Sequence, residues 1–532
     1  MYDIIIKNGA ILDGTGGREF SGDIGIREGL IATIGNLNGE RAEKTIDAKG
    51  CYVTPGFVDI NNHSDTYWQI FLNPDLESLV RQGITTIVGG NCGSSLAPLT
   101  DQSMLSSIQK WTDIRNLNLN WLSTREFLEE VERRALSVNF ATLLGHGTLR
   151  RGFVHDESRP LRTVELASME KMLKQSLHEG SFGMSLGLAY VHGRHATEHE
   201  LSALARVVGK YGGFCTAHVR SEGKELPEAV AEAITMARSS GVRLHISHLK
   251  AVGRRYWELM ERALYLLDAS DSEGVDVSFD IYPYRSTATV LYTILPTWIT
   301  DGGKKMMFER LRNPAIRLEA LHDLKEEHID YSSAVLSVSS LNKMIVRTNV
   351  LDMAHAEGKS PEDVIFDVLL ASDDRAIVSL DALSEENIEK GLRHPFSIIS
   401  TNGTGYPLQH AETREAIHPR CFGAFPRVLF RYVRERKLLG WEEAIHKMTG
   451  KPAAKAGIEK RGTIAVGNHA DIVVINPNEV EDHATSENPY QYPSGIPFVI
   501  VNGKMAVESG EYTGNRSGTV LRREGGFMER FW

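Results

Sequence analysis

Eight short apolar runs recur along the middle of the chain, and stretches with helical periodicity separate them. Two of these stretches are TVELASMEKMLKQSLHEG and LPEAVAEAITMARSSG, in which apolar residues recur three or four positions apart. Short apolar runs of this kind are typical of strands that are buried on both faces of a parallel sheet. Eight alternating strand and helix units predict an α/β fold, the (β/α)8 TIM barrel. The runs are YVTPGFVDI, ITTIVGGN, FATLLGHG, SFGMSLGL, FCTAHV, LHISHL, VDVSFDIYPY and FSIIST.

The two ends of the chain differ from the middle, because they consist of β-rich runs separated by Gly turns. YDIIIKNGAILDG lies at the start and GIPFVIVNGKMAVESGEY lies near the end, and Asn-Gly or Asp-Gly turns punctuate both segments. We therefore predict one small β domain built from residues 1–52 and 450–532, with the barrel in residues 53–449.

The gap before the last predicted strand, from Tyr284 to Pro395, is too long for a single helix. It predicts an inserted subdomain or lid at about residues 285–395. Tyr292, Trp298 and Met344 are candidates for setting specificity there. Large apolar residues more often form the core of their own subdomain, however.

Composition and charge exclude several classes of protein. The formal net charge is −10, from 59 basic and 69 acidic residues in 532, so a polyanionic nucleic acid is not an expected partner. No apolar run is long enough to span a bilayer, and the first residues do not resemble a signal peptide. The four cysteines form no C-x-x-C pair, as is usual in a reducing compartment. We expect a cytoplasmic protein with no membrane partner.

Polar residues that can bind a metal follow most of the predicted strands. Because the strands of such a barrel end at one mouth, these side chains converge there. A single histidine at a strand end is usually a core or surface histidine, and a single cysteine is usually a small buried apolar residue. The convergence of several predicts a metal site, and thiolate together with imidazole suits zinc. The residues are Asp59, His63, Asp65, Cys92, His146, His218, His248 and Asp280.

Several longer motifs are spread along nearly the whole chain. They are IKNGAILDGTG, TPGFVDI, GNCGSS, GHGTLR, HVRSEG, ISHLKAVG, YPY, HPRCFGAFPRVL and MTGKPAAKAGIEKRGTIAVGNHADIVV. Together they resemble the D-aminoacylase family, the N-acyl-D-amino-acid deacylases of the amidohydrolase superfamily. The resemblance implies a barrel with a small β-sandwich domain formed from both termini. It also implies a tightly bound zinc ion held by Cys92, His218 and His248.

The resemblance further implies a weaker second metal position next to a His-x-His pair. Here the first residue of the pair is Asn61 and the second is His63. An Asn amide oxygen is a neutral, hard ligand, so the loss of one imidazole counts against a second metal ion.

Substrate binding is also implied by the resemblance. Lys250, Tyr282 and Arg420 match the residues that meet the substrate carboxylate in the family, and Tyr190 matches another tyrosine of the pocket. Arg binds a carboxylate through two parallel hydrogen bonds, and Lys adds a point charge. The expected partner is therefore a small molecule similar to an N-acyl amino acid.

Asn402 occupies the position of the catalytic Asp of the family. That Asp takes a proton from the attacking water and passes it to the leaving amine, whereas an Asn amide can orient water but cannot carry its proton. We predict a zinc-dependent amidohydrolase that acts on N-acyl-D-amino acids or a related N-acyl amino acid. Asp65, His63 or Glu222 would then be the substitute base.

Three other interpretations stay open. The zinc pocket could catalyse a non-hydrolytic reaction on an N-acyl amino acid, such as amide formation, cyclisation or elimination, where the loss of water activation is useful. Asn402 could be an engineered substitution that traps substrate. A non-catalytic scaffold is the least favoured interpretation, because the residues expected to bind zinc and carboxylate are all retained.

Overall fold

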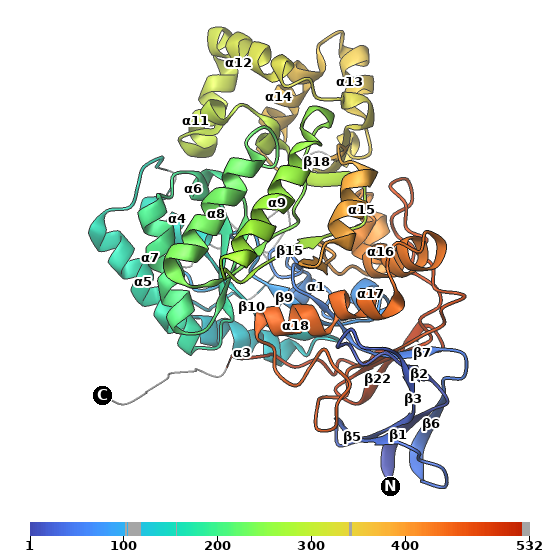
Figure 1. The fold of residues 1–532 in the computed structure, drawn as a ribbon. Helices are drawn as coiled ribbons and strands as arrows, with labels where there is room; N and C mark the ends of the chain where they lie inside the picture. The colour runs from blue at the N-terminus through green and yellow to red at the C-terminus, as the bar shows by residue number, and fades with distance from the viewer. Residues whose placement is uncertain (102–103, 105–116, 118, 156, 340–342, 524–532) are drawn as a thin grey trace, which may run out of the picture.

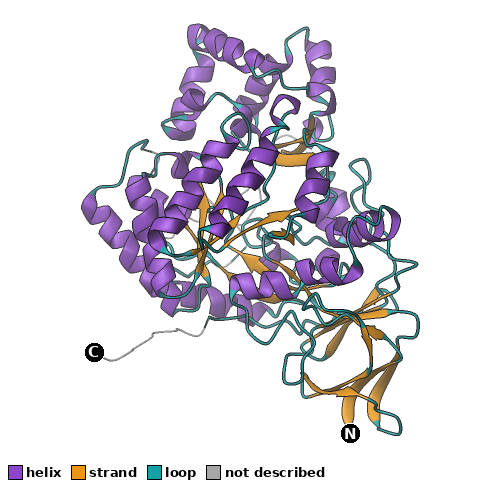
Figure 2. Cartoon of the chain, in the orientation of Figure 1, coloured by secondary structure: helices purple, strands orange, loops and turns teal. Residues whose placement is uncertain are grey.

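A barrel of parallel strands occupies the centre of the computed structural model, and helices surround it (Figures 1 and 2). The structure describes residues 1–101, 104, 117, 119–155, 157–339 and 343–523. In chain order, the barrel strands are β8 (Phe57–Asp59), β9 (Ile84–Gly89), β10 (Asn139–Thr142) with β11 (Leu144–Gly145), β12 (Gly183–Gly187), β13 (Phe214–His218), β14 (Arg243–Ile246), β15 (Val277–Ile281) and β19 (Ser397–Ile399).

Two hydrogen bonds outside the strand ladders close the barrel. His63 N donates to Gly403 O over 2.8 Å and joins the loop after β8 to the loop after β19. Phe182 N donates to Thr142 O over 3.0 Å and joins the start of β12 to β10. The parallel strands therefore form one ring, and the predicted (β/α)8 barrel is confirmed.

The helices around the barrel bury one face each. In α8, the buried residues Val230, Ala233 and Ala237 recur three or four positions apart. Ser123 begins α3 with a capping box to Glu126. No helix in the described part of the chain is both long and apolar enough to cross a membrane. The main helices are α3 (Thr124–Arg134), α4 (His146–Val154), α5 (Thr163–His178), α7 (Glu198–Lys210), α8 (Leu226–Ser240), α9 (Leu259–Ser272), α15 (Glu385–Arg393), α16 (Arg420–Arg427), α17 (Trp441–Met448) and α18 (Gly450–Ala456).

Strands from both ends of the chain build two sheets beside the barrel, at the lower right of Figure 1. Ile4 and Ile24 of one sheet share a buried cluster with Val53, Ile472 and Ile500 of the other, so the sheets form a sandwich. One sheet has the order β5-β4-β1-β6 and the other has the order β23-β22-β21-β20-β7-β2-β3. The strands are β1 (Tyr2–Lys7), β2 (Ala10–Ile11), β3 (Phe20–Ser21), β4 (Asp23–Arg27), β5 (Leu30–Gly35), β6 (Ala42–Asp47), β7 (Tyr52–Pro55), β20 (Ile472–Ile475), β21 (Phe498–Val501), β22 (Lys504–Glu508) and β23 (Glu511–Tyr512).

The run YVTPGFVDI forms two strands rather than one. β7 pairs with β2 and β20 in the sandwich, whereas β8 pairs with β9 in the barrel. Gly56 lies between them at a close approach, because a Cβ there would lie 2.1 Å from Oγ1 of Thr85. The predicted start of the barrel at residue 53 therefore falls inside the sandwich, and the barrel begins after Gly56.

Most of the described residues between β15 and β19 form an inserted subdomain, at the top of Figure 1, before the chain returns to the barrel in α15. Its antiparallel sheet, with the order β16-β18-β17, packs with its helices around a separate apolar cluster. Tyr292 and Trp298 pack against this cluster, whereas Met344 is 90% exposed. The elements are β16 (Ser286–Val290), α10 (Thr297–Thr300), α11 (Gly303–Arg312), α12 (Pro314–Glu326), β17 (Val335–Ser339), α13 (Val350–Glu357), α14 (Pro361–Ala371) and β18 (Ala376–Asp381).

A buried ion pair joins the sandwich to the barrel. The carboxylate of Asp471 pairs with Arg461 and also accepts a hydrogen bond from Asn139 Nδ2, at 3.0 Å, in β10. It accepts a third hydrogen bond from Asn502 N over 2.8 Å. Asp471 and Arg461 are both buried, so each charge depends on the other for its compensation.

We predict that Asp471→Ala lowers the free energy of unfolding by about 3–5 kcal/mol, because it leaves the charge of Arg461 buried without its partner. Glu508→Ala is the matched control, since the Lys44–Glu508 pair is partly exposed and such pairs contribute about 0–1 kcal/mol. Denaturant titration measures both variants. Equal losses in the two variants would contradict the role given to Asp471.

Candidate metal centre and substrate cavity

Three side chains that can bind a metal meet at the carboxyl ends of the barrel strands. His218 ends β13, Cys92 follows β9 and His248 follows β14. One potential ligand atom of each lies within 4.8 Å of the other two, and Cys92 Sγ lies 3.3 Å from His248 Nε2. Within the described residues, this is the one group of three or more His, Cys, Asp or Glu side chains brought so close. All three are buried.

The donor set of this cluster fits a zinc ion. One thiolate and two imidazoles are borderline-soft ligands, and three protein ligands leave a position open for a reacting molecule. Burial raises the pKa of the Cys92 thiol, but the charge of His248 and the hydrogen bonds of His218 and His248 outweigh it and hold the pKa well below its usual value. Cys92 is therefore predisposed to the thiolate form that binds metals.

Three residues of the site share an uncommon backbone conformation. Cys92, His248 and Asn402 have left-handed conformations, with φ angles of 52°, 40° and 44°. Positive φ angles are uncommon in residues other than Gly, and such strain persists where the surroundings hold it in place. For His248, the backbone N donates a hydrogen bond of 2.9 Å to Asp280 Oδ1.

Asp280, near the end of β15, ties several strand ends together. It accepts hydrogen bonds from Asn61 Nδ2 over 3.2 Å, from His245 Nε2 over 2.9 Å, and from Ser400 Oγ. Burial raises the pKa of this carboxyl, but the hydrogen bond and charge of His245 outweigh burial, so the pKa lies below its usual value. Asn61, which replaces an expected His, thus serves as a donor to Asp280.

Asn402 lies beside His63 at the cluster. Asn402 Oδ1 is 2.9 Å from His63 Nε2, and the same nitrogen lies 3.9 Å from Cys92 Sγ. Asp59 fixes the preceding turn, because it accepts hydrogen bonds from Thr401 N, at 3.0 Å, and from Thr401 Oγ1. The structure therefore places an amide, rather than a carboxylate, next to the candidate metal ligands.

Lys250 forms an ion pair with Glu222 next to the cluster. The ammonium group also donates to His248 O over 3.2 Å and lies 2.9 Å from His248 Nδ1. Burial raises the pKa of Glu222, but the charges of Lys250, His218 and His248 outweigh it and hold this pKa well below its usual value. Glu222 is therefore ionised at neutral pH, and it compensates the charge of Lys250.

A cavity of about 530 Å³, including the part open to solvent, lies against the cluster. Two parts of its wall were not predicted from the sequence, namely Tyr67 and residues 287–290 of β16. The nearness of Tyr67 to His63 along the chain is a weak signal, whereas nothing local connects β16 with the barrel mouth. The lining residues are His63, Tyr67, Cys92, Tyr190, His218, Glu222, His248, Lys250, Thr287, Ala288, Thr289, Val290, Asn402 and Arg420.

Asp65 is not part of this lining. Its Oδ2 accepts a hydrogen bond of 2.6 Å from Gly90 N, and its side chain is buried. It therefore supports the turn after β9. Of the three predicted substitute bases, only His63 and Glu222 line the cavity.

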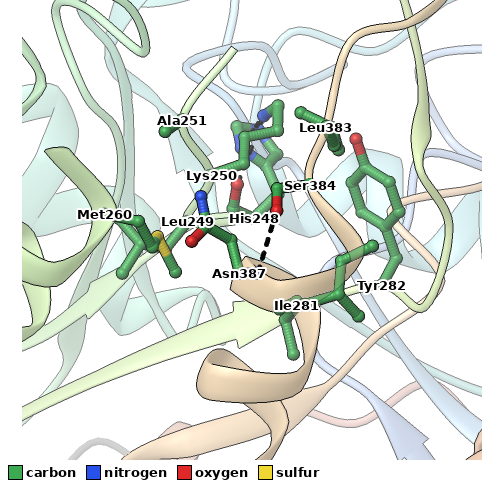
Figure 3. A pocket seen from close by; sticks show the side chains of 11 residues that line it. His248, Leu249, Lys250, Ala251, Met260, Ile281, Tyr282, Leu383, Ser384 and Asn387 are labelled. Carbon is green, nitrogen blue, oxygen red and sulfur yellow. Dashed lines mark hydrogen bonds between the residues drawn. The ribbon is translucent and has the colours of Figure 1, made fainter. Parts of the chain in front are cut away.

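Arg420, the first residue of α16, is a buried cation without an ion-pair partner among the described residues. Its Nε and Nη1 have no hydrogen-bond partner there either. The guanidinium lies 4.9 Å from the centre of the Tyr282 ring, a cation–π contact. Tyr282 itself lines a smaller neighbouring cavity together with Ile281, Leu383 and Lys250 (Figure 3).

Comparisons with known proteins give a consistent result. A model of the amidohydrolase family matches residues 44–362 and 407–507. The N-acyl-D-glutamate deacylase of Alcaligenes xylosoxydans xylosoxydans is 32% identical over 98% of this chain and 97% of its own length. The D-aminoacylase of the same organism is 30% identical over 98% of both chains.

A solved structure of a relative is similar to this protein over nearly the whole chain. It is the N-acyl-D-glutamate deacylase from Bordetella bronchiseptica, complexed with zinc and a phosphonate inhibitor that mimics the tetrahedral intermediate of its reaction. The TM-score is 0.83 at 30% sequence identity, and the match covers 98% of this chain and 100% of that one.

We predict that the purified protein contains about one zinc ion per chain and that Cys92→Ala loses most of it, because three ligands are needed to hold the metal. Cys215→Ala is the matched control, since Cys215 is buried in β13 but lies outside the cluster. Elemental analysis after dialysis measures the zinc content. Full retention of zinc by Cys92→Ala would contradict the assignment of the cluster.

Proposed function

This chain belongs to the amidohydrolase family, in its D-aminoacylase branch, and we propose that it is a zinc-dependent deacylase of N-acyl-D-amino acids or closely related N-acyl amino acids. The observation that carries the proposal is the cluster of Cys92, His218 and His248 beside a cavity that contains an unpaired arginine. The Bordetella relative is complexed with zinc and with a mimic of a tetrahedral intermediate, which supports amide hydrolysis as the chemistry.

The lining residues have distinct parts in this proposal. A zinc ion held by the cluster would polarise the scissile carbonyl and lower the pKa of a water molecule. Arg420 binds the substrate carboxylate, because its guanidinium is buried, unpaired and part of the cavity wall. Tyr190, whose hydroxyl lies 3.4 Å from His218 Nδ1, supports the orientation of that imidazole.

Proton transfer is the step for which the site is least well equipped. Asn402 can hold a water molecule but cannot take its proton, and a positioned acid–base group contributes about 10²–10⁴-fold to the rate. Glu222 is the one carboxylate among the described lining residues, and His63 lies beside Asn402. These two groups are the remaining proton acceptors, and we propose that the hydrolysis they support is slow.

Asn61 and Asn402 together favour a second candidate function, a non-hydrolytic reaction on the same class of substrate. Both amides stand where the family pattern has groups that activate water, while the cluster and Arg420 are retained. Amide formation, cyclisation or elimination requires a bound and polarised substrate but no activated water. Analysis of the products separates this candidate from hydrolysis.

We also propose a cytoplasmic location for the protein. All four cysteines are free thiols, including the solvent-accessible Cys51. Unpaired thiols are usual in a reducing compartment, whereas secreted proteins tend to pair them.

We predict that Asn402→Asp raises the rate of hydrolysis of N-acyl-D-amino acids by about 10²–10⁴-fold, because it restores a group that can carry the proton. The zinc-loaded protein and the variant receive the same panel of N-acyl-D- and N-acyl-L-amino acids, and free amine is quantified. Peptide mass analysis of residues 402–403 excludes deamidation of the Asn-Gly pair as the source of activity.

Asn478→Asp is the matched control, since Asn478 is exposed in a turn far along the chain from the site and undergoes the same chemical change. Its rate is expected to equal that of the unaltered protein. Absence of amine release from every D-substrate by both the protein and Asn402→Asp would refute the deacylase proposal. Conversion of substrate without free amine would favour the non-hydrolytic candidate.

A further inference from the structure

Among the described residues, the cavity wall contains two Lys or Arg side chains, Lys250 and Arg420, and only Arg420 lacks a carboxylate partner. Lys250 pairs with Glu222, and its ammonium group also contacts the backbone oxygen of His248. Both members of the pair are largely buried, with side-chain exposures of 9% and 17%. Separating them would leave an unpaired buried charge, so Lys250 is not readily available to a substrate anion.

Arg420 differs from Lys250 in each of these respects. It has no ion-pair partner among the described residues, and Nε and Nη1 are buried without a hydrogen bond. The Tyr282 ring supports the guanidinium but does not compensate its charge. A buried, uncompensated guanidinium with free donors matches one carboxylate, bound through two hydrogen bonds.

Apart from Lys250 and Arg420, no lysine or arginine is among the described residues that line the wall. Away from the cluster, Tyr67 and Tyr190 supply phenol groups, and residues 287–290 of β16 supply hydroxyl and methyl groups. Glu222 is the one carboxylate among the described lining residues, and its negative charge would repel a second carboxylate. Arg194, on the short helix α6 (Val191–Arg194), lies outside the lining and pairs with Asp301.

We propose that the cavity selects N-acyl-D-amino acids with an uncharged side chain and disfavours those with an acidic side chain. This inference rests on the proposed function and narrows its substrate class. Arg420 binds the α-carboxylate that all these substrates share. A second carboxylate would lose its water while no further unpaired Lys or Arg among the described lining residues compensates its charge. Sequence identity does not indicate which side chain the substrate carries, because the N-acyl-D-glutamate deacylase and the D-aminoacylase are almost equally similar to this chain, at 32% and 30% identity.

The test compares two ligands that have the same shape and differ in charge, N-acetyl-D-glutamine and N-acetyl-D-glutamate. With the zinc-loaded protein at neutral pH, we expect the glutamine compound to exceed the glutamate compound by at least about 10-fold in both affinity and kcat/KM. Calorimetric binding to the unaltered protein supplies the affinities, independently of turnover. Equal or tighter binding of the glutamate compound would overturn the inference.

Two variants locate the effect in the cavity. Thr289→Lys adds a cation to the partly exposed wall strand β16 and should reduce the preference for the glutamine compound to less than about 3-fold. Leu318→Lys adds the same charge on α12, at a position 70% exposed, and should leave the preference unchanged. Arg420→Gln should weaken both ligands by at least about 10-fold, because both use their α-carboxylate.

The two proposals fail in different ways. If the glutamine compound binds more tightly, in a manner that depends on Arg420, but is never hydrolysed, the inference about the cavity holds and the deacylase proposal fails. If both compounds are hydrolysed and the glutamate compound is preferred, the deacylase proposal holds and the inference fails. If Leu318→Lys changes the preference for the glutamine compound as much as Thr289→Lys does, this preference depends on the net charge of the protein and not on the cavity wall. The inference is then wrong.

Discussion

The arrangement of the strand ends at the mouth of the barrel depends on the hydrogen bonds that the Asp280 carboxylate accepts. This carboxylate, in β15, is fully buried. It accepts hydrogen bonds from three other barrel strands or the loops that follow them: from Asn61 after β8, from His245 and His248 N at β14, and from Ser400 after β19. Burying an ionised carboxylate is costly unless its neighbours satisfy it. Because the donors come from separate strands, the requirement to satisfy Asp280 fixes how those strand ends lie relative to one another. The left-handed turn at His248 is one result, and this turn places an imidazole near Cys92.

The two amides of the site keep the hydrogen bonds of the mouth while changing its chemistry. Asn61 Nδ2 donates to Asp280, while Asn61 Oδ1 is buried without a hydrogen-bond partner among the described residues, and Asn402 Oδ1 lies 2.9 Å from His63 Nε2. What an amide cannot do is carry a proton or compensate a cation. In the proposed function, the site therefore holds a metal and a carboxylate as the family pattern does, and proton transfer depends on Glu222 and His63. Both groups also contact the candidate metal ligands, so proton transfer and metal binding share the same few atoms.

The features that sequence could predict have local signatures. Buried strands and amphipathic helices recur with fixed periods, and because parallel strands end at one mouth, the convergence of Cys92, His218 and His248 followed from their places after the strands. Contacts between distant segments have no such signature. The run YVTPGFVDI looks like one strand, and only the pairing of β7 with β20 divides it. Likewise, the wall formed by β16 and the pairing of Lys250 with Glu222 depend on how separate loops meet. That pairing matters, because the motif alone assigns Lys250 to the substrate.

In the proposed complex, the Cys92–His218–His248 cluster and Arg420 hold the two ends of one substrate. The most direct measurement is diffraction at the zinc absorption edge from crystals grown with a phosphonate analogue of N-acetyl-D-leucine. We expect a zinc peak among the three cluster residues, with the phosphonate next to it and the carboxylate of the analogue on the Arg420 guanidinium. A zinc peak elsewhere, or a carboxylate bound away from Arg420, would contradict it.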